Sequence, residues 1–398
     1  MFFYLLVYWV FAVTSAVGTL GCLGAVATLV ARFRQPAQAG AEGPPAALAL
    51  IVPIKGADAH TEGNLSALVA SRVPGTVEYL FAMESADDPA YAVCQRVIEQ
   101  DPNRRSRVVL TGPANGRMGK QHNLAAAVRQ TSSAVIGSMD ADVQVEPDLL
   151  AAMLRQVQEP GAGVAYALPC YWGDGPAGGA LVALYTNYSF APNFAALALR
   201  GNQPFIIGSL WLVARATLEQ IGGLEQFGAT LSDDAAIGQA IAQHGLRNVL
   251  VPRTVHIPFE PLPLAGGAKH LQKWLAMLRA EGLGAYCTIL LLWHPLFWAA
   301  LALLVAIPIR HGYPSLLNIA AGLALVALAA RVGSAWLLDR LAYHRTNSWL
   351  PLWLIPYELL VVPVLFGAGL FRRTIEWRGR RYQLGPHGKI EHAADVTP

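Results

Sequence analysis

The chain contains 398 residues, of which 54% are hydrophobic and only 14% are charged, whereas about a quarter of the residues in a typical soluble domain carry charge. The net charge is only +3 at pH 7, and the basic residues gather beside apolar segments, which argues against a nucleic-acid-binding protein. Four scattered cysteines without a Cys-x-x-Cys pair support neither a zinc site nor a disulfide framework. The composition predicts an integral membrane protein with one inserted soluble domain.

Residues 1–34 are predicted to be a transmembrane signal anchor. Residues 1–31 carry no charge, and as a helix they are long enough to cross a ~30 Å hydrocarbon core. We expect the segment to be retained, because it is longer than a signal-peptide core and no basic segment precedes it. Arg32 and Arg34 follow it, which places the next part of the chain in the cytoplasm.

Residues 35–268 are predicted to form one cytosolic α/β domain after a linker at 35–47. Strands are expected over 47–53, 77–83, 106–110, 134–139 and 164–168, and helices over 62–73, 90–99, 120–130 and 147–158. This alternation predicts a mostly parallel sheet covered by helices, with ligands beyond the carboxyl ends of the strands. Further on, helices are expected over 180–200, 216–221 and 233–244, a strand over 205–213 and a loop over 258–268.

The last third of the chain is predicted to return to the membrane. An amphipathic helix over 270–279, within a segment of residues 269–283, is expected to lie at the membrane interface. Residues 284–371 contain three apolar stretches, and residues 372–398 form a basic tail that is expected to be cytosolic. Three crossings in this region would put the tail outside, so we expect one apolar stretch to be re-entrant or interfacial.

An Asp-x-Asp pair, Asp140 and Asp142, ends the apolar strand expected over 134–139. Two carboxylates at the tip of a buried strand are costly unless a cation holds them, and a hard divalent ion that bridges to phosphates, Mg²⁺ or Mn²⁺, suits them. The plainer interpretation is a pair of acids in an exposed turn. We favour a metal site in an enzyme that binds a nucleotide diphosphate, because Glu84 and Asp88 are expected on the same rim of the sheet.

Asp233 and Asp234 begin the helix expected over 233–244, where the helix dipole alone favours carboxylates. The functional interpretation is a general base, which takes the proton of an attacking hydroxyl. The sequence leaves both interpretations open. Lys120 follows a glycine-containing turn and is a candidate phosphate ligand, although its surroundings do not match a Walker A loop.

The chain also resembles a known family over nearly its whole length, from the first span to the tail. It is similar to the ceramide glucosyltransferases within the family 2 glycosyltransferases, which have a GT-A catalytic fold. Each motif that carries the resemblance is weak evidence by itself, but together the motifs are specific for the family. They are Pro53-Ile54-Lys55-Gly56, Asp87-Asp88-Pro89-Ala90, Gly119-Lys120-Gln121-His122-Asn123-Leu124, Asp140 with Asp142, Gly208-Ser209 to Arg215, Gly222-Gly223-Leu224, Asp233-Asp234 and Trp377-Arg378-Gly379-Arg380-Arg381-Tyr382.

This resemblance implies an inverting transfer of a sugar, with glucose expected, from a UDP-sugar to the primary hydroxyl of ceramide. It implies that Asp234 is the catalytic base and that Asp140 and Asp142 hold the divalent metal. The residues that would bind the donor are Lys55, Glu84, Asp88, Lys120, Asn123 and Asp140. The protein would then be a bacterial inner-membrane enzyme with a cytoplasmic catalytic domain.

One motif departs from the family pattern. The family's (Gln/Arg)-x-x-Arg-Trp reads His270-Leu271-Gln272-Lys273-Trp274 here. Lys273 keeps a positive charge but loses the bidentate fork of arginine. Together with Asp233, the residues His270, Lys273 and Trp274 are assigned to the diphosphate and acceptor side.

Three alternatives stay open at this point. In the first alternative, the acceptor is a hopanoid or another membrane lipid. The second is a processive polysaccharide synthase, which would normally have more spans and an intact Gln-x-x-Arg-Trp. The third is a catalytically inactive membrane scaffold, against which the complete acidic set argues.

Overall fold

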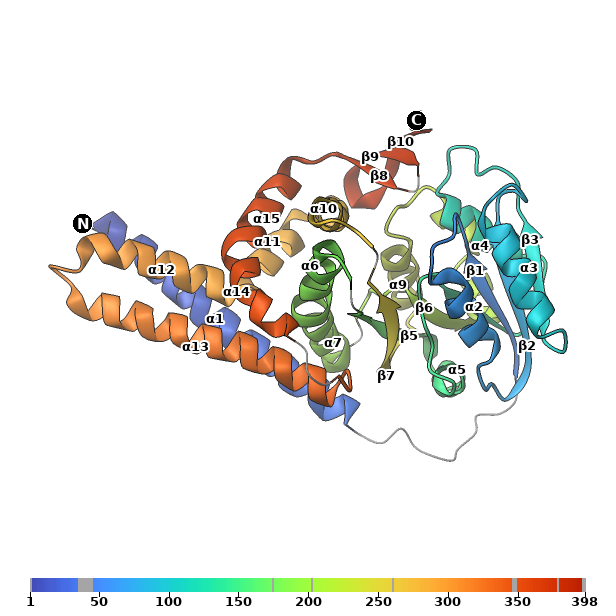
Figure 1. Ribbon diagram of the computed structural model, residues 1–398, viewed down its shortest axis with the longest axis horizontal. Helices are drawn as coiled ribbons and strands as arrows, with labels where there is room; N and C mark the ends of the chain where they lie inside the picture. The colour runs from blue at the N-terminus through green and yellow to red at the C-terminus, as the bar shows by residue number, and fades with distance from the viewer. Residues whose placement is uncertain are drawn as a thin grey trace. The chain divides into compact units, whose positions relative to one another are not determined.

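The computed structural model describes residues 2–34, 46–173, 175–201, 203–259, 261–345, 349–377 and 379–395. The chain forms two compact units (Figure 1). The membrane unit comprises Met1–Gln35, Gly173–Leu197 and Phe259–Arg373, and the sheet unit comprises Pro36–Trp172, Ala198–Pro258 and Thr374–Pro398. Most of the predicted linker and Arg378 of the tail motif lie outside the described residues.

The sheet unit is built on a seven-stranded sheet with the order β3-β2-β1-β4-β6-β5-β7. The strands are β1 (Ala46–Pro53), β2 (Gly75–Met83), β3 (Arg105–Leu110), β4 (Val135–Met139), β5 (Ala162–Trp172), β6 (Leu210–Ala214) and β7 (Arg247–Pro258). Strand β1 pairs in parallel with β2 and β4, β2 with β3, and β5 with β7, whereas β6 is antiparallel to β4 and β5. The predicted α/β class with a mostly parallel sheet is therefore confirmed.

Helices cover this sheet and hold its carboxyl-end loops. They are α2 (Thr61–Val69), α3 (Ala90–Gln100), α4 (Gly119–Val128), α5 (Leu149–Val157), α8 (Arg215–Gln220) and α9 (Asp233–Gln243). Helix α4 packs on β1 and β2, and α9 packs on β5 and β7. The central strands β1 and β4 are almost wholly buried, as expected for continuous apolar strands covered on both faces.

Two strands of this sheet, β6 and β7, differ from the expectation from the sequence. The strand expected over 205–213 begins only at Leu210, after a loop that contains Gly208. The strand β7 was not predicted, because Pro252 and polar residues interrupt its apolar pattern. Strand β7 is the last in the sheet order, and an edge strand tolerates proline because one side needs no ladder hydrogen bond.

The tail forms a small antiparallel sheet in the sheet unit, where the sequence indicated only a basic segment. Its strands are β8 (Thr374–Trp377), β9 (Arg380–Leu384) and β10 (Ile390–Asp395), in the order β10-β9-β8. The backbone N–H of Leu231 donates to the carbonyl of Gly388 at 2.9 Å, and that of Ile390 donates to Ala229 at 2.8 Å. These bonds join the tail to the loop that precedes α9.

The membrane unit is helical. Its helices are α1 (Phe2–Phe33), α6 (Ala177–Tyr185), α7 (Ala191–Arg200), α10 (Leu264–Glu281), α11 (Leu283–Leu292), α12 (Pro295–Ile309), α13 (Pro314–Leu341), α14 (Leu354–Pro356) and α15 (Val362–Phe371). Helices α1, α12 and α13 lie side by side (Figure 1). They meet at Ala12, Ala302, Ala306 and Ala320, small residues that allow close approach of helices in a membrane.

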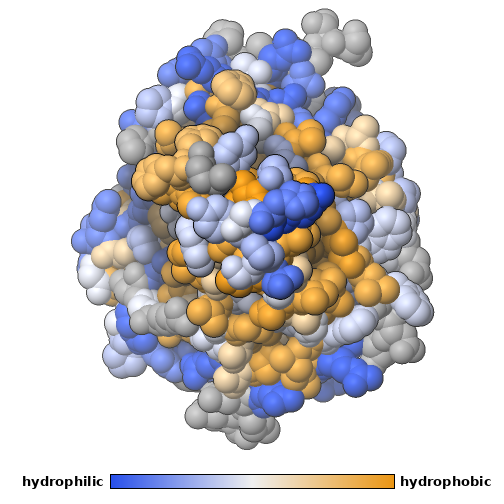
Figure 2. Space-filling view, turned by 90° about the vertical axis from the view of Figure 1, so that its left-hand side faces the viewer, coloured by the Kyte–Doolittle hydropathy of each residue, from blue (hydrophilic) through white to orange (hydrophobic). Residues whose placement is uncertain are grey.

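Three stretches of the described chain are long and apolar enough to cross a membrane: Phe2–Phe33, Pro314–Leu341 and Leu350–Phe371. Helices α11 and α12 pass the same test together, but they are bent by 70° at their junction. Many large apolar side chains of these helices are exposed, and Figure 2 shows hydrophobic surface around the end where α12 and α13 meet. These features are those of a membrane protein.

The helix predicted over 180–200 is interrupted by a π-helical turn at Thr186–Phe190. A π turn changes the backbone pairing, and side chains of α13 and the following loop bond its carbonyl groups. Nη1 of Arg331 donates to the carbonyl of Tyr188, and the hydroxyl of Tyr343 donates to that of Asn187, both at 2.7 Å. The predicted loop 258–268 also differs, because α10 already begins at Leu264.

Candidate active site

The Asp-x-Asp pair lies in a tight turn at the carboxyl end of β4. The backbone N–H of Asp140 donates to the carbonyl of Ser209 at 2.9 Å, which continues the pairing of β4 with β6. Inside the turn, the Nδ2 of Asn64 donates to the carbonyl of Ala141 at 3.1 Å. Strand pairing and a buried amide of α2 therefore fix the backbone that carries Asp140 and Asp142.

Lys120 connects this turn to the acids of α9. Its Nζ lies 2.7 Å from Oδ1 of Asp140 and 4.0 Å from Oδ2 of Asp233, and it donates to the carbonyl of Gly208 at 3.3 Å. Burial alone would lower the pKa of Lys120, but the carboxylates of Asp140, Asp233 and Asp234 outweigh it and raise the pKa above its usual value. Lys120 is therefore a permanent cation between the two acidic clusters.

Asp233 and Asp234 differ in their surroundings. Asp233 is only 5% exposed and accepts a short hydrogen bond from Nε2 of Gln121. Asp234 accepts backbone N–H groups from Gly208 at 3.1 Å and from Ala235 at 2.9 Å. Burial and the neighbouring Asp233 raise the pKa of Asp234 to about 7, against the influence of Lys120 and these N–H groups. A carboxylate with this pKa can accept and release a proton near neutrality.

Asp88 holds the loop that follows β1. Its two carboxylate oxygens accept the backbone N–H of Gly56 at 2.9 and 3.1 Å, and Oδ1 accepts that of Ala90 at 2.9 Å. Gly56 has a φ of +74°, a conformation that favours glycine. The exposed Lys55 precedes this turn, so Asp88 positions the backbone that carries Lys55.

Glu84 follows β2 and is fixed by three donors. Arg380 of β9 binds its carboxylate with both terminal nitrogens, at 3.1 and 3.0 Å, and the N–H of Ala114 donates to it at 3.2 Å. Although burial opposes it, these donors lower the pKa of Glu84 below its usual value. Glu84 is therefore an oriented carboxylate at neutral pH.

Asn123 is buried in α4, where it joins the ends of two strands. Its Oδ1 accepts the hydroxyl of Thr111 at 2.6 Å, and its Nδ2 donates to the carbonyl of Ala82 at 3.3 Å. These bonds give Asn123 a clear role in holding the rim. Direct contact between Asn123 and a donor stays a prediction.

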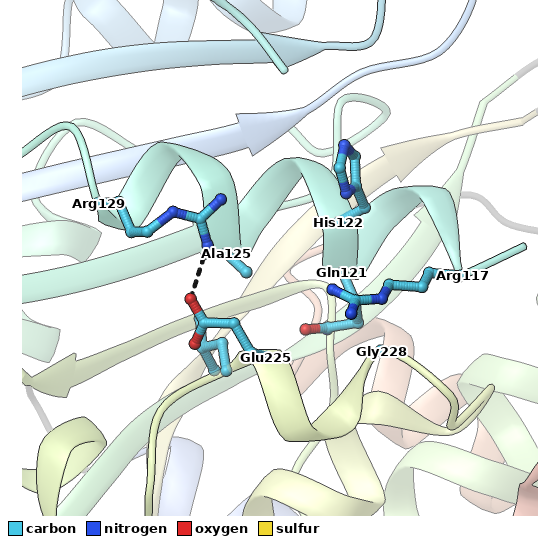
Figure 3. Close-up of a pocket in the computed structure, with 8 residues that line it drawn as sticks. Arg117, Gln121, His122, Ala125, Arg129, Glu225 and Gly228 are labelled. Carbon is cyan, nitrogen blue, oxygen red and sulfur yellow. Dashed lines mark hydrogen bonds and ion pairs between the residues drawn. The ribbon is translucent and has the colours of Figure 1, made fainter. Parts of the chain in front are cut away.

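Helix α4 and the turn before α9 line a pocket that is shown in Figure 3. Arg129 pairs there with Glu225 at 2.7 Å, and the N–H of Met118 donates to the carbonyl of Gly228 at 3.0 Å. Gln121 also lines the pocket. These contacts fix α4 against the turn before α9, so that Lys120 and Gln121 can reach the acids.

The three remaining predicted residues lie on α10 in the membrane unit. His270 and Trp274 are one helical turn apart, and their rings meet edge to face with centroids 4.6 Å apart. Trp274 also packs near Tyr185, at 6.3 Å between centroids. Lys273 shares this region of α10 because positions three and four apart lie on one helix face.

The chemistry of the Asp-x-Asp turn fits a hard divalent cation. No group of three or more His, Cys, Asp or Glu side chains that could hold a metal occurs among the described residues. Carboxylates are nonetheless suitable ligands for Mg²⁺, which is commonly held by one or two of them together with substrate phosphates and water. Asp140 and Asp142 would therefore hold such an ion jointly with the donor.

Several residues of this network were not predicted as site residues. Gly208 contacts both Lys120 and Asp234 through its backbone, Gln121 bonds Asp233, and Arg380 bonds Glu84. A methyl group at Gly208 would lie 3.2 Å from Asp234, a tighter contact than most such groups make. These residues do lie within the motifs of the family resemblance, which was the available signal.

Comparison with known proteins gives a family and several relatives. The model of glycosyl transferase family 21 matches residues 7–390. The motifs in the sequence had indicated ceramide glucosyltransferases within family 2. Ceramide glucosyltransferase 1 of Caenorhabditis elegans is 25% identical over 205 residues, 50% of this chain and 43% of that relative, so the chain spans less than half of it. Ceramide glucosyltransferase 3 of the same organism is 21% identical over 366 residues, 86% of this chain and 74% of that relative.

A solved structure is also similar. The mannosyltransferase PcManGT from Pyrobaculum calidifontis, in complex with GDP-Man and Mn²⁺, aligns at 20% identity with a TM-score of 0.45, covering 89% of this chain and 98% of that one. The family match supports the resemblance to ceramide glucosyltransferases found in the sequence. Because it extends over nearly the whole chain, the protein belongs to glycosyl transferase family 21 and is a membrane glycosyltransferase.

Proposed function

We propose that the protein transfers a sugar, glucose in the leading hypothesis, from a UDP-sugar to the primary hydroxyl of ceramide, with inversion at the anomeric carbon. The observation that carries the proposal is that Asp234, a carboxylate whose pKa is raised to about 7, lies together with the cation Lys120 and the Asp-x-Asp turn. A base, a cation and a metal-binding carboxylate pair are the groups that displacement of a nucleotide diphosphate needs.

The proposed reaction is a single displacement. Asp234 takes the proton of the acceptor hydroxyl while the hydroxyl oxygen attacks the anomeric carbon of the sugar. The bond from that carbon to the phosphate oxygen breaks on the opposite face, and its electron pair leaves with UDP. Lys120 offsets negative charge near the leaving diphosphate, and Glu84 and Asp88 form the nucleoside side of the site. Asp140 and Asp142 would hold the divalent cation, Mg²⁺ or Mn²⁺, which when bound supplies further positive charge to the diphosphate.

A lipid acceptor is supported by the membrane helices and by the names of the relatives, which are ceramide glucosyltransferases. The interfacial helix α10 carries His270, Lys273 and Trp274, and we assign these residues to the diphosphate and acceptor side. The catalytic domain is proposed to face the cytoplasm of a bacterial cell, at the inner membrane, because Arg32 and Arg34 lie at the C-terminal end of α1.

A radiolabelled transfer assay on the detergent-purified protein tests the proposal. UDP-glucose, UDP-galactose and UDP-N-acetylglucosamine are offered with ceramide, with and without Mg²⁺ or Mn²⁺. Metal-dependent labelling of ceramide from UDP-glucose is the expected result. Hydrolysis of a donor without labelled ceramide would contradict the proposal that ceramide is the acceptor. Hopanoids and other membrane lipids would then be tested as acceptors. Long polymeric products would support a processive synthase instead.

A further inference from the structure

Arg380 reaches the donor side of the site from the C-terminal sheet. Its guanidinium binds Glu84 fork to fork, at 3.1 and 3.0 Å, and the side chains of the two residues are only 16% and 21% exposed. The N–H of Ala114 adds a third bond to the same carboxylate. A bidentate pair of this kind fixes the plane of the carboxylate as well as its position.

The pair lies against the beginning of α4. A methyl group built at Gly119 would stand 3.2 Å from Oε1 of Glu84 and 3.3 Å from Nη1 of Arg380. The next residue, Lys120, binds Asp140. Arg380 is therefore near both the carboxylate assigned to the nucleoside and the helix that carries the phosphate-side lysine.

Charge explains why a cation belongs beside Glu84. A nucleotide diphosphate is anionic, and an unneutralised carboxylate on the same rim would oppose its binding. The charge of Lys55 also favours the ionised form of Glu84, and Arg380 adds two direct hydrogen bonds to it. Arg380 thus places a positive charge directly against the carboxylate that Glu84 would present to the donor.

The tail is also attached by contacts other than this pair. Backbone hydrogen bonds join Leu231 to Gly388 and Ile390 to Ala229, and these bonds are independent of the side chain at position 380. The neighbouring Arg381 gives a contrast, because it pairs with Glu376 within the small sheet, at 2.7 Å, and both side chains are more than half exposed.

We propose that Arg380 is a positioning residue of the donor site, which holds Glu84 in the orientation that binds the nucleoside and removes its repulsion of the diphosphate. This inference rests on the proposed function for the identity of the ligand. It assigns the C-terminal sheet to the substrate-binding machinery of the enzyme.

Binding of UDP to the full-length protein in detergent, measured by calorimetry, tests this role. We expect Arg380→Gln to raise the Kd about tenfold or more, because a charged hydrogen-bonded pair is lost. The turnover at saturating donor should change less than about threefold, because the residue acts on ground-state binding. Arg380→Lys keeps the charge without the fork and should give an intermediate Kd, whereas Arg381→Gln should bind as the wild type does.

Two further variants separate positioning from simple attachment of the tail. Because Arg380 is argued to act through Glu84, the double variant Glu84→Gln/Arg380→Gln should bind UDP no more weakly than Glu84→Gln alone. The charge swap Glu84→Arg/Arg380→Glu keeps an ion pair between the two positions but removes the carboxylate from position 84. This variant should therefore still bind UDP poorly. Melting temperatures report whether each variant is folded.

Recovery of the wild-type Kd in the charge-swapped protein would overturn the proposal, and so would equal Kd values for Arg380→Gln and Arg381→Gln. GDP and ADP are measured in parallel. If the wild type binds one of these in place of UDP, the proposed donor is wrong, and the same variants measured with that nucleotide still decide the role of Arg380. If the wild type binds none of them, both proposals fail.

Discussion

At the scale of residues, the site depends on a largely buried lysine, Lys120, among several acids. Lys120 lies within 4.0 Å of carboxylate oxygens of both Asp140 and Asp233, and Gly208 joins Lys120 to Asp234 through its carbonyl and N–H groups. The acids would repel one another without this lysine. The proton affinity of Asp234 is therefore set by groups on three different elements.

The first prediction concerns the proposed base. Asp234→Asn keeps the shape of the side chain but removes its ability to take a proton, so we expect kcat to fall by at least about a hundredfold. The Kd for UDP should stay within about threefold of wild type, because a residue used in the chemical step contributes little to donor binding. Transfer assays and nucleotide binding measure the two effects, and unchanged kcat would mean that Asp234 serves only as a negative charge in the first turn of α9.

The second prediction concerns pH. Asp234 must be ionised to accept a proton, and its pKa is raised to about 7, so kcat/KM should rise with pH through neutrality and then level off. Lys120→Gln removes a positive charge that favours the ionised form, so the rise should move to higher pH. A profile measured with His244→Gln, an exposed histidine at the end of α9, should keep the wild-type midpoint. Activity that falls as the pH rises through 7 would exclude Asp234 as the base.

At the scale of elements, α13 anchors the π-helical turn between α6 and α7. Arg331 donates to the carbonyl of Tyr188 and to the hydroxyl of Ser189, and it forms a short ion pair with Glu358. The hydroxyl of Tyr188 binds Asp339 at 2.9 Å. Losing one partner of such a polar contact inside an apolar unit costs stability, because the other group is left without a hydrogen bond.

The third prediction follows from this ion pair. Arg331→Leu leaves Glu358 without its charge partner, and the loss should cost about 3 kcal/mol or more of stability. The double variant Arg331→Leu/Glu358→Leu should be less destabilised than the sum of the two single variants, since neither charge is then stranded. Melting in detergent measures this, with Leu325→Ala, a 68% exposed position on α13, as the control. Additive losses would contradict a coupled pair.

An element could be predicted from the sequence when neighbouring residues determine it, and could not when it depends on residues far away in the chain. Strands β1, β2 and β4 are continuous apolar runs, and their pattern was visible in the sequence. Strand β7 was missed because Pro252 interrupts its apolar pattern and its partner β5 is distant in sequence. The tail sheet was missed because arginines interrupt the apolar pattern of its short strands, although these strands pair with their sequence neighbours. The same holds at the site: Asp140 was indicated by the end of an apolar strand and the role of Asp234 by the family resemblance, whereas the contacts of Gln121 and Gly208 depend on tertiary packing.

At the scale of the whole molecule, the tail sheet constrains the path of the chain through the membrane. Because β8–β10 belong to the same unit as β1–β7, we expect both sheets on one side of the membrane, so the chain between β7 and β8 must cross the membrane an even number of times. Within the membrane unit, Tyr8 of α1 bonds the carbonyl of Leu316, and Ser15 bonds that of Pro295. The turn between α12 and α13 therefore lies at the N-terminal end of α1, away from Phe33.

The fourth prediction is the side on which that turn appears. We expect α1, α12 and α13 to cross and the stretch Leu350–Phe371 to stay in one leaflet. In a Cys287→Ser background, where the other cysteines are buried, Asn103→Cys and Gln383→Cys should react with an impermeant thiol reagent from the same side of sealed vesicles. His311→Cys should react from the opposite side. Labelling of His311→Cys from the same side as Asn103→Cys would instead make Leu350–Phe371 a crossing segment.

The position of the tail also bears on how the protein is made. The ribosome synthesises Glu84 early, whereas Arg380 emerges after every apolar segment described here. If Arg380 completes the donor side, a chain that is still being inserted has its acids but lacks a finished nucleotide site. Stalled or shortened chains would then carry a folded sheet and bind donor poorly. Completion of synthesis would itself be the step that confers activity on the enzyme.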